Sequence, residues 1–346
     1  MSSPALAVRG LVKRYGSFAA ADGVDLAVER GQAFGLLGPN GSGKTTVLSC
    51  ALGLFRRTSG TAEVLGVASD ELWRLGGRLA CVFDTPALLP GHTVAQNLAY
   101  QRRLRGPHGS GASASGAGTG FAPRAIDEAR ALELVGLASI ASRRASGLSL
   151  GQKKRLSLAA ALAGEPELIV LDEPLSGLDP MGVRDILALL RELVARGITL
   201  VVSSHRLLEM QTLLTHLAVL HKGRVLHQGP LEALLGDDST VHVRVDDEAR
   251  ARSVLTGNGL SGIGNVTSAP NGGLFVRSKA GDAPRVAKLL VEAGIALESL
   301  APQRRDLQAA FEAVVDAELA RRGETREPQH LGPAPTKSQI ASGGPR

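Results

Sequence analysis

Residues 38–45, from Gly38 to Thr45, read GPNGSGKT, and this octapeptide decides the fold. It matches the phosphate-binding pattern G-x-x-x-x-G-K-[ST], in which glycines allow backbone N–H groups to wrap a phosphate. The apolar run QAFGLLG comes before it, and KTTVLSCALGLF, with helical spacing, follows it. A strand, a glycine loop and a helix in this order place the positive end of the helix dipole at the phosphate. The octapeptide therefore predicts a nucleotide-phosphate site.

Two side chains of this loop carry the chemistry. Lys44 is expected to reach the β- and γ-phosphates, and the Thr45 hydroxyl is expected to ligate Mg²⁺. A chance lysine in a glycine-rich turn is the alternative, and the flanking strand and helix argue against it. The residues expected to bind the nucleotide here are Gly38, Pro39, Asn40, Gly41, Ser42, Gly43, Lys44, Thr45 and Thr46.

A second motif, ELIVLDEP at residues 167–174, ends a buried strand with two acids. Asp172 suits a direct or water-mediated contact with Mg²⁺, and Glu173 can polarise a water for in-line attack on the γ-phosphate. Two acids after a strand can also cap the next turn, so the motif is weak by itself. Together with the phosphate loop it predicts nucleotide hydrolysis.

Strands and helices alternate over the first 230 or so residues. The segments LAVRGLVKRYG and GVDLAVERG alternate with period two and predict antiparallel strands. Further on, GRLACVFD, PELIVLDEP and GITLVVSSH read as buried strands, each followed by a helical pattern. This alternation predicts an α/β fold with a mostly parallel sheet covered on both faces.

The composition allows more than one domain and restricts the partners. The chain has 346 residues and a net charge of +6, which fits an anionic partner such as a nucleotide, a membrane surface or a nucleic acid. Aromatic residues make up only 3%, which weakens any proposal of base stacking on single-stranded nucleic acid. The two cysteines, Cys50 and Cys81, favour a reducing compartment over a disulfide framework. We expect no signal peptide and no membrane-spanning segment.

The chain divides into four predicted parts. Residues 5–235 form the nucleotide-binding region, and the Gly/Ala/Ser-rich residues 106–123 within it are expected to be a flexible insertion. Residues 240–320 suggest a small β-α-β-β-α-β domain followed by a helix. Residues 324–346 are polar and contain proline, so we expect a disordered tail.

Four further motifs resemble those of the nucleotide-binding subunit of an ATP-binding-cassette (ABC) transporter. LSLGQKKRLSLAAAL from Leu148 is similar to the family signature, with Leu150 in place of the usual first glycine. SGLDP at residues 176–180 resembles the D-loop, SSH ending at His205 resembles the switch histidine, and Tyr15 resembles the aromatic that stacks on adenine. The resemblance covers residues 5–235 and implies a P-loop ABC-type fold with a parallel core, an antiparallel β subdomain and an α-helical subdomain.

The resemblance implies that two subunits sandwich two ATP molecules head to tail, with Mg²⁺. Ser149, Gly151, Gln152 and the N–H groups opening their helix would form a second anion site for the partner's ATP. Leu150 is read as a tolerated variant. Asp179 would cross the dimer interface, although a helix cap before Pro180 explains it equally well.

Two single residues gain a role only from the family pattern. His205 would bond the γ-phosphate and take part in catalysis with Glu173 and Lys44, whereas an isolated strand-end histidine is ordinarily a satisfied side chain. Tyr15 would stack on adenine, whereas an isolated tyrosine more often only packs.

The chain departs from the family at Asp84, within VFDTPALLPGHTVAQNL at residues 82–98. The family usually has a glutamine here, which touches Mg²⁺ or the attacking water and opens the loop that contacts the membrane subunit. Aspartate keeps an oxygen ligand for Mg²⁺ but adds a negative charge near the γ-phosphate. We assign Asp84 to the metal site with Thr45 and Asp172. Whether it ligates Mg²⁺ or only shapes the loop is open.

These resemblances imply an ATP-hydrolysing subunit that powers export of a drug, antibiotic or other natural product through a separate polytopic permease. The ending RRDLQAAFEAVV is similar to that of the exporter branch. We expect a peripheral location at the cytoplasmic face of the membrane, a homodimer or paired subunit, and no nucleic acid. The alternative is a soluble ABC ATPase acting on nucleic acid or ribosomes. A kinase or GTPase is disfavoured by the signature and SGLDP motifs.

Overall fold

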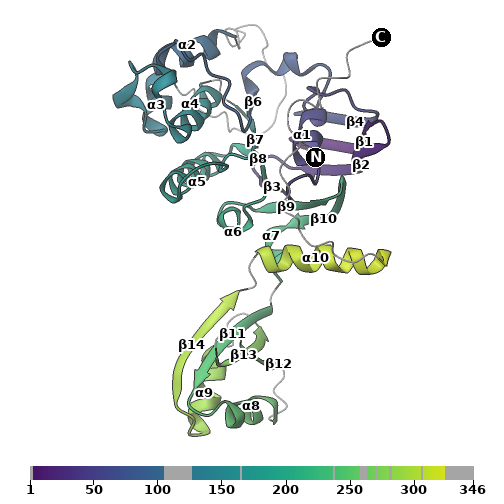
Figure 1. Cartoon of the computed structure of the whole chain (residues 1–346), viewed down its shortest axis with the longest axis vertical. Coiled ribbons are helices and arrows are strands. Elements are labelled where there is room, and N and C mark those ends of the chain that lie inside the picture. The colour runs from purple at the N-terminus through teal and green to yellow at the C-terminus, as the bar shows by residue number, and fades with distance from the viewer. Residues whose placement is uncertain are drawn as a thin grey trace.

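A computed structural model describes most of the chain. The described ranges are 3–104, 127–163, 166–236, 238–257, 263–269, 272–279, 283–304 and 307–323. The expected insertion at 106–123 and the expected tail at 324–346 lie outside these ranges. Figure 1 shows a large region of two sheets with helices and, at the other end of the molecule, a smaller sheet with two helices.

The centre of the large region is a six-stranded sheet in the order β10-β9-β3-β8-β7-β6. Five neighbouring strands run parallel, as the strand–helix alternation predicts, and β10 pairs antiparallel with β9. The strands are β3 (Ala33–Leu37), β6 (Leu79–Val82), β7 (Leu168–Asp172), β8 (Thr199–Ser204), β9 (His216–His221) and β10 (Arg224–Pro230). Strands β3, β7 and β8 are buried along their whole length, which explains their nearly continuous apolar sequence.

A second, antiparallel sheet has the order β2-β1-β4-β5. Its strands are β1 (Leu6–Tyr15), β2 (Phe18–Val28), β4 (Ser59–Val64) and β5 (Val67–Ala68). Helix α1 (Lys44–Ala51) packs on β1, β2 and β4, and one apolar cluster joins this helix to strands of both sheets. The 3₁₀ segment η1 (Leu72–Arg78) then leads from this sheet to β6. The two period-two segments are therefore antiparallel partners, as predicted.

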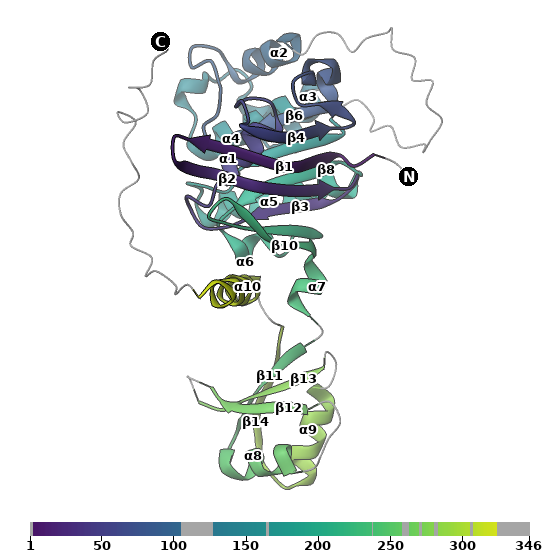
Figure 2. The ribbon, with the colours of Figure 1, turned by 90° about the vertical axis from the view of Figure 1, so that its right-hand side faces the viewer.

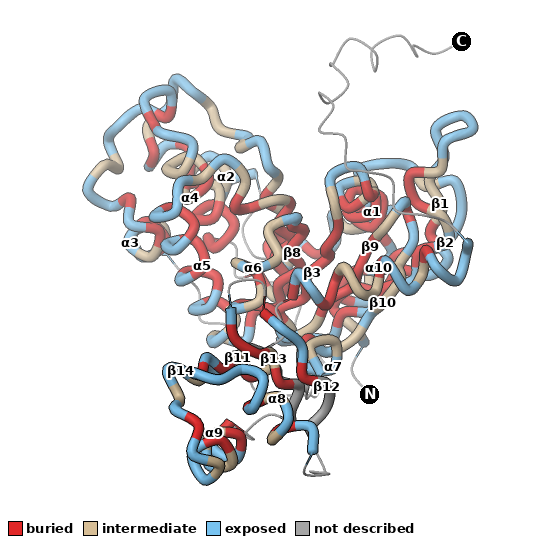
Figure 3. Tube along the Cα trace, turned by 60° about the horizontal axis from the view of Figure 1, so that its bottom comes forward, coloured by how far each residue is buried: buried red, intermediate tan, exposed pale blue. Residues whose placement is uncertain are grey.

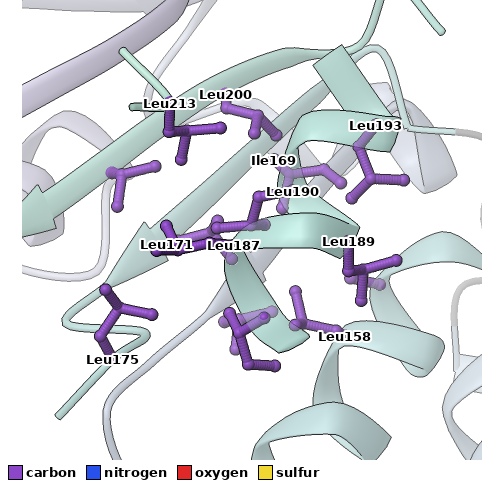
Figure 4. Packing of buried hydrophobic residues seen from close by; sticks show 14 of the residues in the cluster. Leu158, Ile169, Leu171, Leu175, Leu187, Leu189, Leu190, Leu193, Leu200 and Leu213 are labelled. Atoms are coloured by element: carbon purple, nitrogen blue, oxygen red, sulfur yellow. The ribbon is translucent and has the colours of Figure 1, made fainter. Parts of the chain in front are cut away.

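Helices lie on the other side of the central sheet. Helix α4 (Leu150–Leu162) contacts β6 and packs against α2 (Val94–Leu104) and α3 (Glu128–Leu134), which also contact each other. Helix α5 (Pro180–Ala195) follows β7, and the short 3₁₀ segments η2 (Ala138–Ile140) and η3 (Ala145–Gly147) come before α4. Figure 4 shows leucines of α5 lying over β7 and β8, with Leu158 of α4 beside Leu189. The buried positions of α5 repeat every three or four residues, so one stripe of the helix faces the core. Figure 3 shows burial concentrated in the central strands and the helix faces turned toward them.

The smaller sheet has the order β12-β13-β11-β14 and is antiparallel throughout. Its elements follow the predicted β-α-β-β-α-β order: β11 (Asp238–Val245), α8 (Glu248–Gly257), β12 (Ile263–Ser268), β13 (Leu274–Lys279), α9 (Ala283–Glu292) and β14 (Leu297–Arg304). Both helices contribute to an apolar cluster of this sheet's own, separate from those of the large region. Figure 2 shows this unit below the large region.

The last described helix, α10 (Leu307–Arg322), returns to the large region. It packs against β9, β10, α6 (Leu207–Met210) and α7 (Leu231–Leu235), and Figures 1 and 2 show it between those elements and the small sheet. Four of its buried residues recur every four positions and belong to the large core: Leu307, Phe311, Val315 and Leu319. The expected unit 240–320 thus includes a helix whose apolar face lies elsewhere. The domain division itself stays a prediction.

Glu167 joins two segments that are far apart in the sequence. Its carboxylate accepts hydrogen bonds from Arg30, which follows β2, and from Arg78, which precedes β6. Burial alone would raise the pKa of Glu167, but the hydrogen bonds and charges of the two arginines outweigh it and hold the pKa below its usual value. The ionised carboxylate therefore stabilises the folded chain.

We expect Glu167→Gln to lower the free energy of unfolding at pH 7 by on the order of 1 kcal/mol. Because the pKa is lowered in the folded state, this stabilisation is complete above the ordinary value of 4.5 and is lost as pH falls through the folded value. Urea unfolding at several pH values should show the difference from the unsubstituted chain shrinking in acid. Glu133→Gln, which removes an exposed pair with Arg130, is the control. A difference that does not change with pH would contradict the assignment.

Candidate functional site

The phosphate-binding sequence forms the loop between β3 and α1, as predicted. Gly41 and Gly43 have φ of 80° and 105°, a conformation that favours glycine. A Cβ on Gly43 would lie 2.3 Å from the carbonyl oxygen of Ala20, and one on Gly38 would lie 2.3 Å from that of Leu220. The loop is therefore pressed against both sheets, and only backbone fits at these two points.

The loop presents hydrogen-bond donors that suit an anion. Helix α1 begins at Lys44 after Gly43, so the N–H groups of its first turn have no intrahelical acceptor. The hydroxyl of Ser42 is buried and has no hydrogen-bond partner among the described residues. A buried hydroxyl without a partner is costly, and a phosphate oxygen would satisfy it. The loop therefore fits the phosphates of a nucleotide.

Lys44 lies over this loop and is buried. Its ammonium donates to the carbonyl oxygens of Gly38 at 2.8 Å and Pro39 at 3.2 Å. It also lies 3.3 Å from Oε1 of Glu173, so the two expected catalytic side chains form an ion pair. A charged lysine held beside the glycine loop supplies the positive charge that a triphosphate needs.

Thr45 and Asp172 also lie together, as expected for a magnesium site. The Thr45 hydroxyl donates to Oδ2 of Asp172 at 2.9 Å, and the hydroxyl of Ser203 on β8 donates to Oδ1. Hydroxyl and carboxylate oxygens are the ligands that Mg²⁺ prefers. Thr45 is exposed, so this pair faces a space that an ion can enter. In the described ranges, the structure contains no cluster of three or more His, Cys, Asp or Glu side chains around one point.

Glu173 is held in an unusual backbone conformation with φ of 50°. Its N–H donates to Oγ of Ser203 at 3.0 Å, which fixes the backbone at the end of β7. Its Oε2 lies 2.9 Å from Nδ1 of His205, which follows β8. A strained non-glycine residue persists only where its surroundings hold it, and such residues gather at functional sites. The structure thus brings Lys44, Glu173 and His205 together.

Asp84 contacts a residue to which the sequence analysis gave no role. Its Oδ1 accepts a hydrogen bond at 3.1 Å from the ammonium of Lys154, on α4. Lys154 is buried and also donates to the carbonyl oxygens of Glu173 at 3.0 Å and Ser176 at 2.7 Å. Residues 84 and 154 are far apart in the sequence, so no local pattern links them. The assignment of Asp84 to the metal site stays a prediction.

The signature segment opens α4 with a capping box. The hydroxyl of Ser149 accepts the N–H of Gln152 at 3.2 Å, and the Gln152 side chain accepts the N–H of Ser149 at 3.0 Å. Leu150 is exposed, and a Cβ on Gly151 would meet Leu178 of the SGLDP segment at 3.5 Å. Helix α4 packs on α2, α3 and β6, whereas α1 packs on the antiparallel sheet. One chain therefore carries its two expected anion sites on different elements.

Two other expected site residues have local contacts. Asp179 caps α5, because its Oδ1 accepts the N–H of Gly182 at 3.0 Å with Pro180 at the first helical position. Tyr15 is half-exposed at the end of β1, and the Lys13 ammonium lies 4.7 Å from its ring centroid. Burial raises the pKa of Tyr15, so the ring stays a neutral phenol. Its role toward adenine stays a prediction.

Comparison with known proteins identifies relatives that match about two thirds or more of this chain. The family model for the ABC transporter matches residues 21–176. The bacitracin transport ATP-binding protein BcrA of Bacillus licheniformis is 35% identical over 229 residues, covering 65% of this chain and 69% of that protein. The Nod factor export ATP-binding protein I of Ralstonia nicotianae is 35% identical over 261 residues, covering 73% and 77%. The methionine import ATP-binding protein MetN of Rhizobium etli is 33% identical over 234 residues, covering 66% and 62%.

Solved structures agree with the sequence comparison. A nucleotide-free ATP-binding cassette from an ABC transporter matches with a TM-score of 0.56 and 28% identity, covering 66% of this chain and 92% of that one. Within the described ranges, the chain has no helix that is both long and apolar enough to cross a bilayer.

We expect Gly43→Ala to lower the free energy of unfolding by about 2 kcal/mol or more, because the new methyl group clashes with Ala20 and the backbone is strained. Gly91→Ala is the matched control, since its Cβ would have nothing within 4 Å. Chemical denaturation should show the control within about 0.5 kcal/mol of the unsubstituted chain. Equal stability of the two variants would contradict the described packing of the loop.

Proposed function

Since this chain belongs to the ABC transporter family of ATP-binding proteins, we propose that it powers export of a drug, antibiotic or other natural product through a separate membrane permease. The observation that carries its chemistry is the meeting of Lys44, Thr45, Asp172, Glu173 and His205 at one end of the central sheet. ABC ATPase chemistry needs these groups: a charge on the phosphates, oxygen ligands for a cation, and a base for the attacking water.

The phosphate loop and Lys44 would bind the triphosphate of ATP. The loop donates backbone N–H groups and the Ser42 hydroxyl, and Lys44 exchanges its carbonyl acceptors for phosphate oxygens. Thr45 and Asp172 are the residues that would hold Mg²⁺, which supplies charge neutralisation at the β- and γ-phosphates when it is bound. These two residues fit the cation because the Thr45 hydroxyl oxygen and Oδ2 of Asp172, both suitable Mg²⁺ ligands, lie 2.9 Å apart.

Glu173 is the residue that we assign to water activation. Its carboxylate is held between Lys44 and His205, so its direction is set before a substrate enters. The carboxylate accepts a proton from the attacking water as the water oxygen bonds to the γ-phosphorus, and the bond from that phosphorus to the β,γ-bridging oxygen breaks, so ADP leaves with that oxygen. His205, which follows the neighbouring strand, contacts Glu173 through Nδ1 and would bond the γ-phosphate from its other ring nitrogen.

A complete site needs two copies of the nucleotide-binding subunit. The signature residues at the start of α4 are Ser149, Gly151 and Gln152, and they lie on another helix than the phosphate loop, which precedes α1. We propose that they face the ATP of a second subunit. Asp179 lies in the SGLDP segment next to this motif and would approach the partner's phosphate loop. Head-to-tail pairing of two chains satisfies both halves, and ATP binding then favours the dimer by linkage.

The permease would bind at the loop between Asp84 and α2, and this arrangement would place the chain at the cytoplasmic face of the membrane. The Nod factor relative is named for export and the bacitracin relative for transport, which favours natural products as cargo, whereas the methionine relative is named for import. The similarity of the last helix to the exporter branch also favours export. Binding of single-stranded nucleic acid by base stacking is disfavoured, since aromatic residues are only 3% of the chain.

We expect Glu173→Gln to bind ATP with a dissociation constant within about threefold of the unsubstituted chain and to lose at least about a hundredfold in hydrolysis rate. Lys44→Ala is the contrasting variant, because it removes the charge on the phosphates and should weaken ATP binding itself. Phosphate release and equilibrium binding to labelled ATP measure the two effects. Rapid hydrolysis by Glu173→Gln would remove that residue from the base role.

Transport is tested by recovery of the partner and by direction. We expect affinity purification from membranes of the native host to recover a polytopic protein with the chain. Vesicles that contain both proteins should move a labelled natural product away from the ATP-accessible face. Accumulation in the other direction would contradict export and leave the ATPase assignment intact.

A further inference from the structure

We propose that Lys154 is a positioning residue for ATP hydrolysis, which ties Asp84 to the turn that follows Glu173. The inference rests on the assignment of Glu173 in the proposed function. The lysine ammonium bonds two other segments: the acceptors are Oδ1 of Asp84, in the segment after β6, and the carbonyl oxygens of Glu173 and Ser176, after β7. The lysine itself belongs to α4, the helix that the signature segment begins.

The burial of Lys154 makes these contacts obligatory. Its side chain is only 3% exposed, and an ammonium without partners at such a position is strongly destabilising. An ammonium has three donor hydrogens, and the three acceptors lie at 3.1, 3.0 and 2.7 Å, so every donor has a partner. The contact is therefore a fixed junction between segments.

The two carbonyl contacts hold the backbone that directs Glu173. Glu173 has φ of 50°, and its carbonyl oxygen also accepts the N–H of Ser176 at 3.1 Å, which closes the turn. Lys154 bonds the carbonyls at both ends of this turn. Loss of the lysine would leave the Glu173 carbonyl with the N–H of Ser176 as its remaining partner and would free the Ser176 carbonyl from its bond to the ammonium. The direction of the Glu173 carboxylate would then be less well defined.

The contact with Asp84 connects this turn to the loop that we propose for the permease. Asp84 is 53% exposed and begins that loop. The far part of the loop is held by Asn97, whose side chain accepts the N–H of Leu89 at 2.8 Å and donates to its carbonyl oxygen at 3.0 Å. A displacement of the loop therefore has a direct path to Lys154, and from there to the Glu173 turn. The ammonium also offsets the negative charge of Asp84.

A second contact of α4 reaches the same segment. A Cβ on Gly177 would lie 2.6 Å from Cδ2 of Leu150, so the exposed Leu150 side chain lies against the SGLDP segment. Leu150 is the residue that replaces glycine in the signature. The first two turns of α4 thus contact the Glu173–Gly177 segment twice, once with an apolar group and once with a charge.

The test compares Lys154→Met, Asp84→Asn and the double variant in the full chain. Lys154→Met removes all three contacts, so we expect kcat for ATP to fall at least about tenfold with KM within about threefold. Asp84→Asn keeps both carbonyl contacts, so we expect a fall of about threefold. The double variant should be no slower than Lys154→Met, because the lysine's contacts are already lost. Lys288→Met, which removes an exposed pair with Glu292, is the matched control.

Hydrogen exchange of the nucleotide-free proteins supplies a readout that does not depend on hydrolysis. The amide of Ser176 bonds the Glu173 carbonyl, so Lys154→Met should speed exchange in a peptide covering residues 174–178 about tenfold or more. Asp84→Asn should speed it less, and Lys288→Met not at all. If Lys154→Met does not fold, Asp84→Asn decides by the same two measurements.

Several results would overturn the proposal. They are a kcat for Lys154→Met within twofold of the unsubstituted chain, unchanged exchange at residues 174–178, equal losses in ATP affinity and kcat, or multiplicative effects in the double variant. Absence of ATP hydrolysis by the unsubstituted chain would instead contradict the proposed function. The two failures are therefore distinguishable.

Discussion

The register of three parallel strands is the constraint on which the site depends. In β3 and β8, Leu37 is level with Ser204, and in β7 and β8, Asp172 is level with Ser203. The carboxyl ends of the three strands therefore lie together at one end of the sheet. The phosphate loop follows β3, Glu173 follows β7 and His205 follows β8. Segments that are far apart in the sequence therefore lie within side-chain reach of one another at that end of the sheet. A shift of one residue would turn each of these side chains to the other face.

Buried polar side chains of the large region lie at the same end of the sheet. Lys44, Lys154, Asp172 and Ser203 are all buried, and each has a partner of complementary character in this area. Burying charge costs stability even when it is paired, and apolar side chains of similar size would often be more stable. The large apolar clusters on both faces of the sheet offset that cost. The arrangement is thus explained by what the polar groups do with a nucleotide rather than by stability.

The sequence predicts those parts of the site that have a fixed spacing. The loop at 38–45 and the strand ending at Glu173 follow from local pattern, because each sits where strand becomes loop. The contact between Lys154 and Asp84 was missed, since it depends on how α4 packs across β6. The docking of α10 was missed for a similar reason: the helix follows β14 directly, but its apolar stripe matches the large core. Both cases have the same cause. A local sequence pattern shows that a residue or helix face needs a partner, but only the tertiary packing determines which partner it contacts.

The pairing of β11 with β14 has a consequence for the small sheet as a unit. Ser239 lies opposite Arg304, so the chain enters and leaves the sheet at neighbouring points. The segment from β11 to β14 is therefore an insertion between α7 and α10, which belong to the large region on either side of it. We expect that a short turn can replace it and keep both helices in place. The small sheet has an apolar cluster of its own, so on this expectation it can change in evolution or in engineering without altering the nucleotide site.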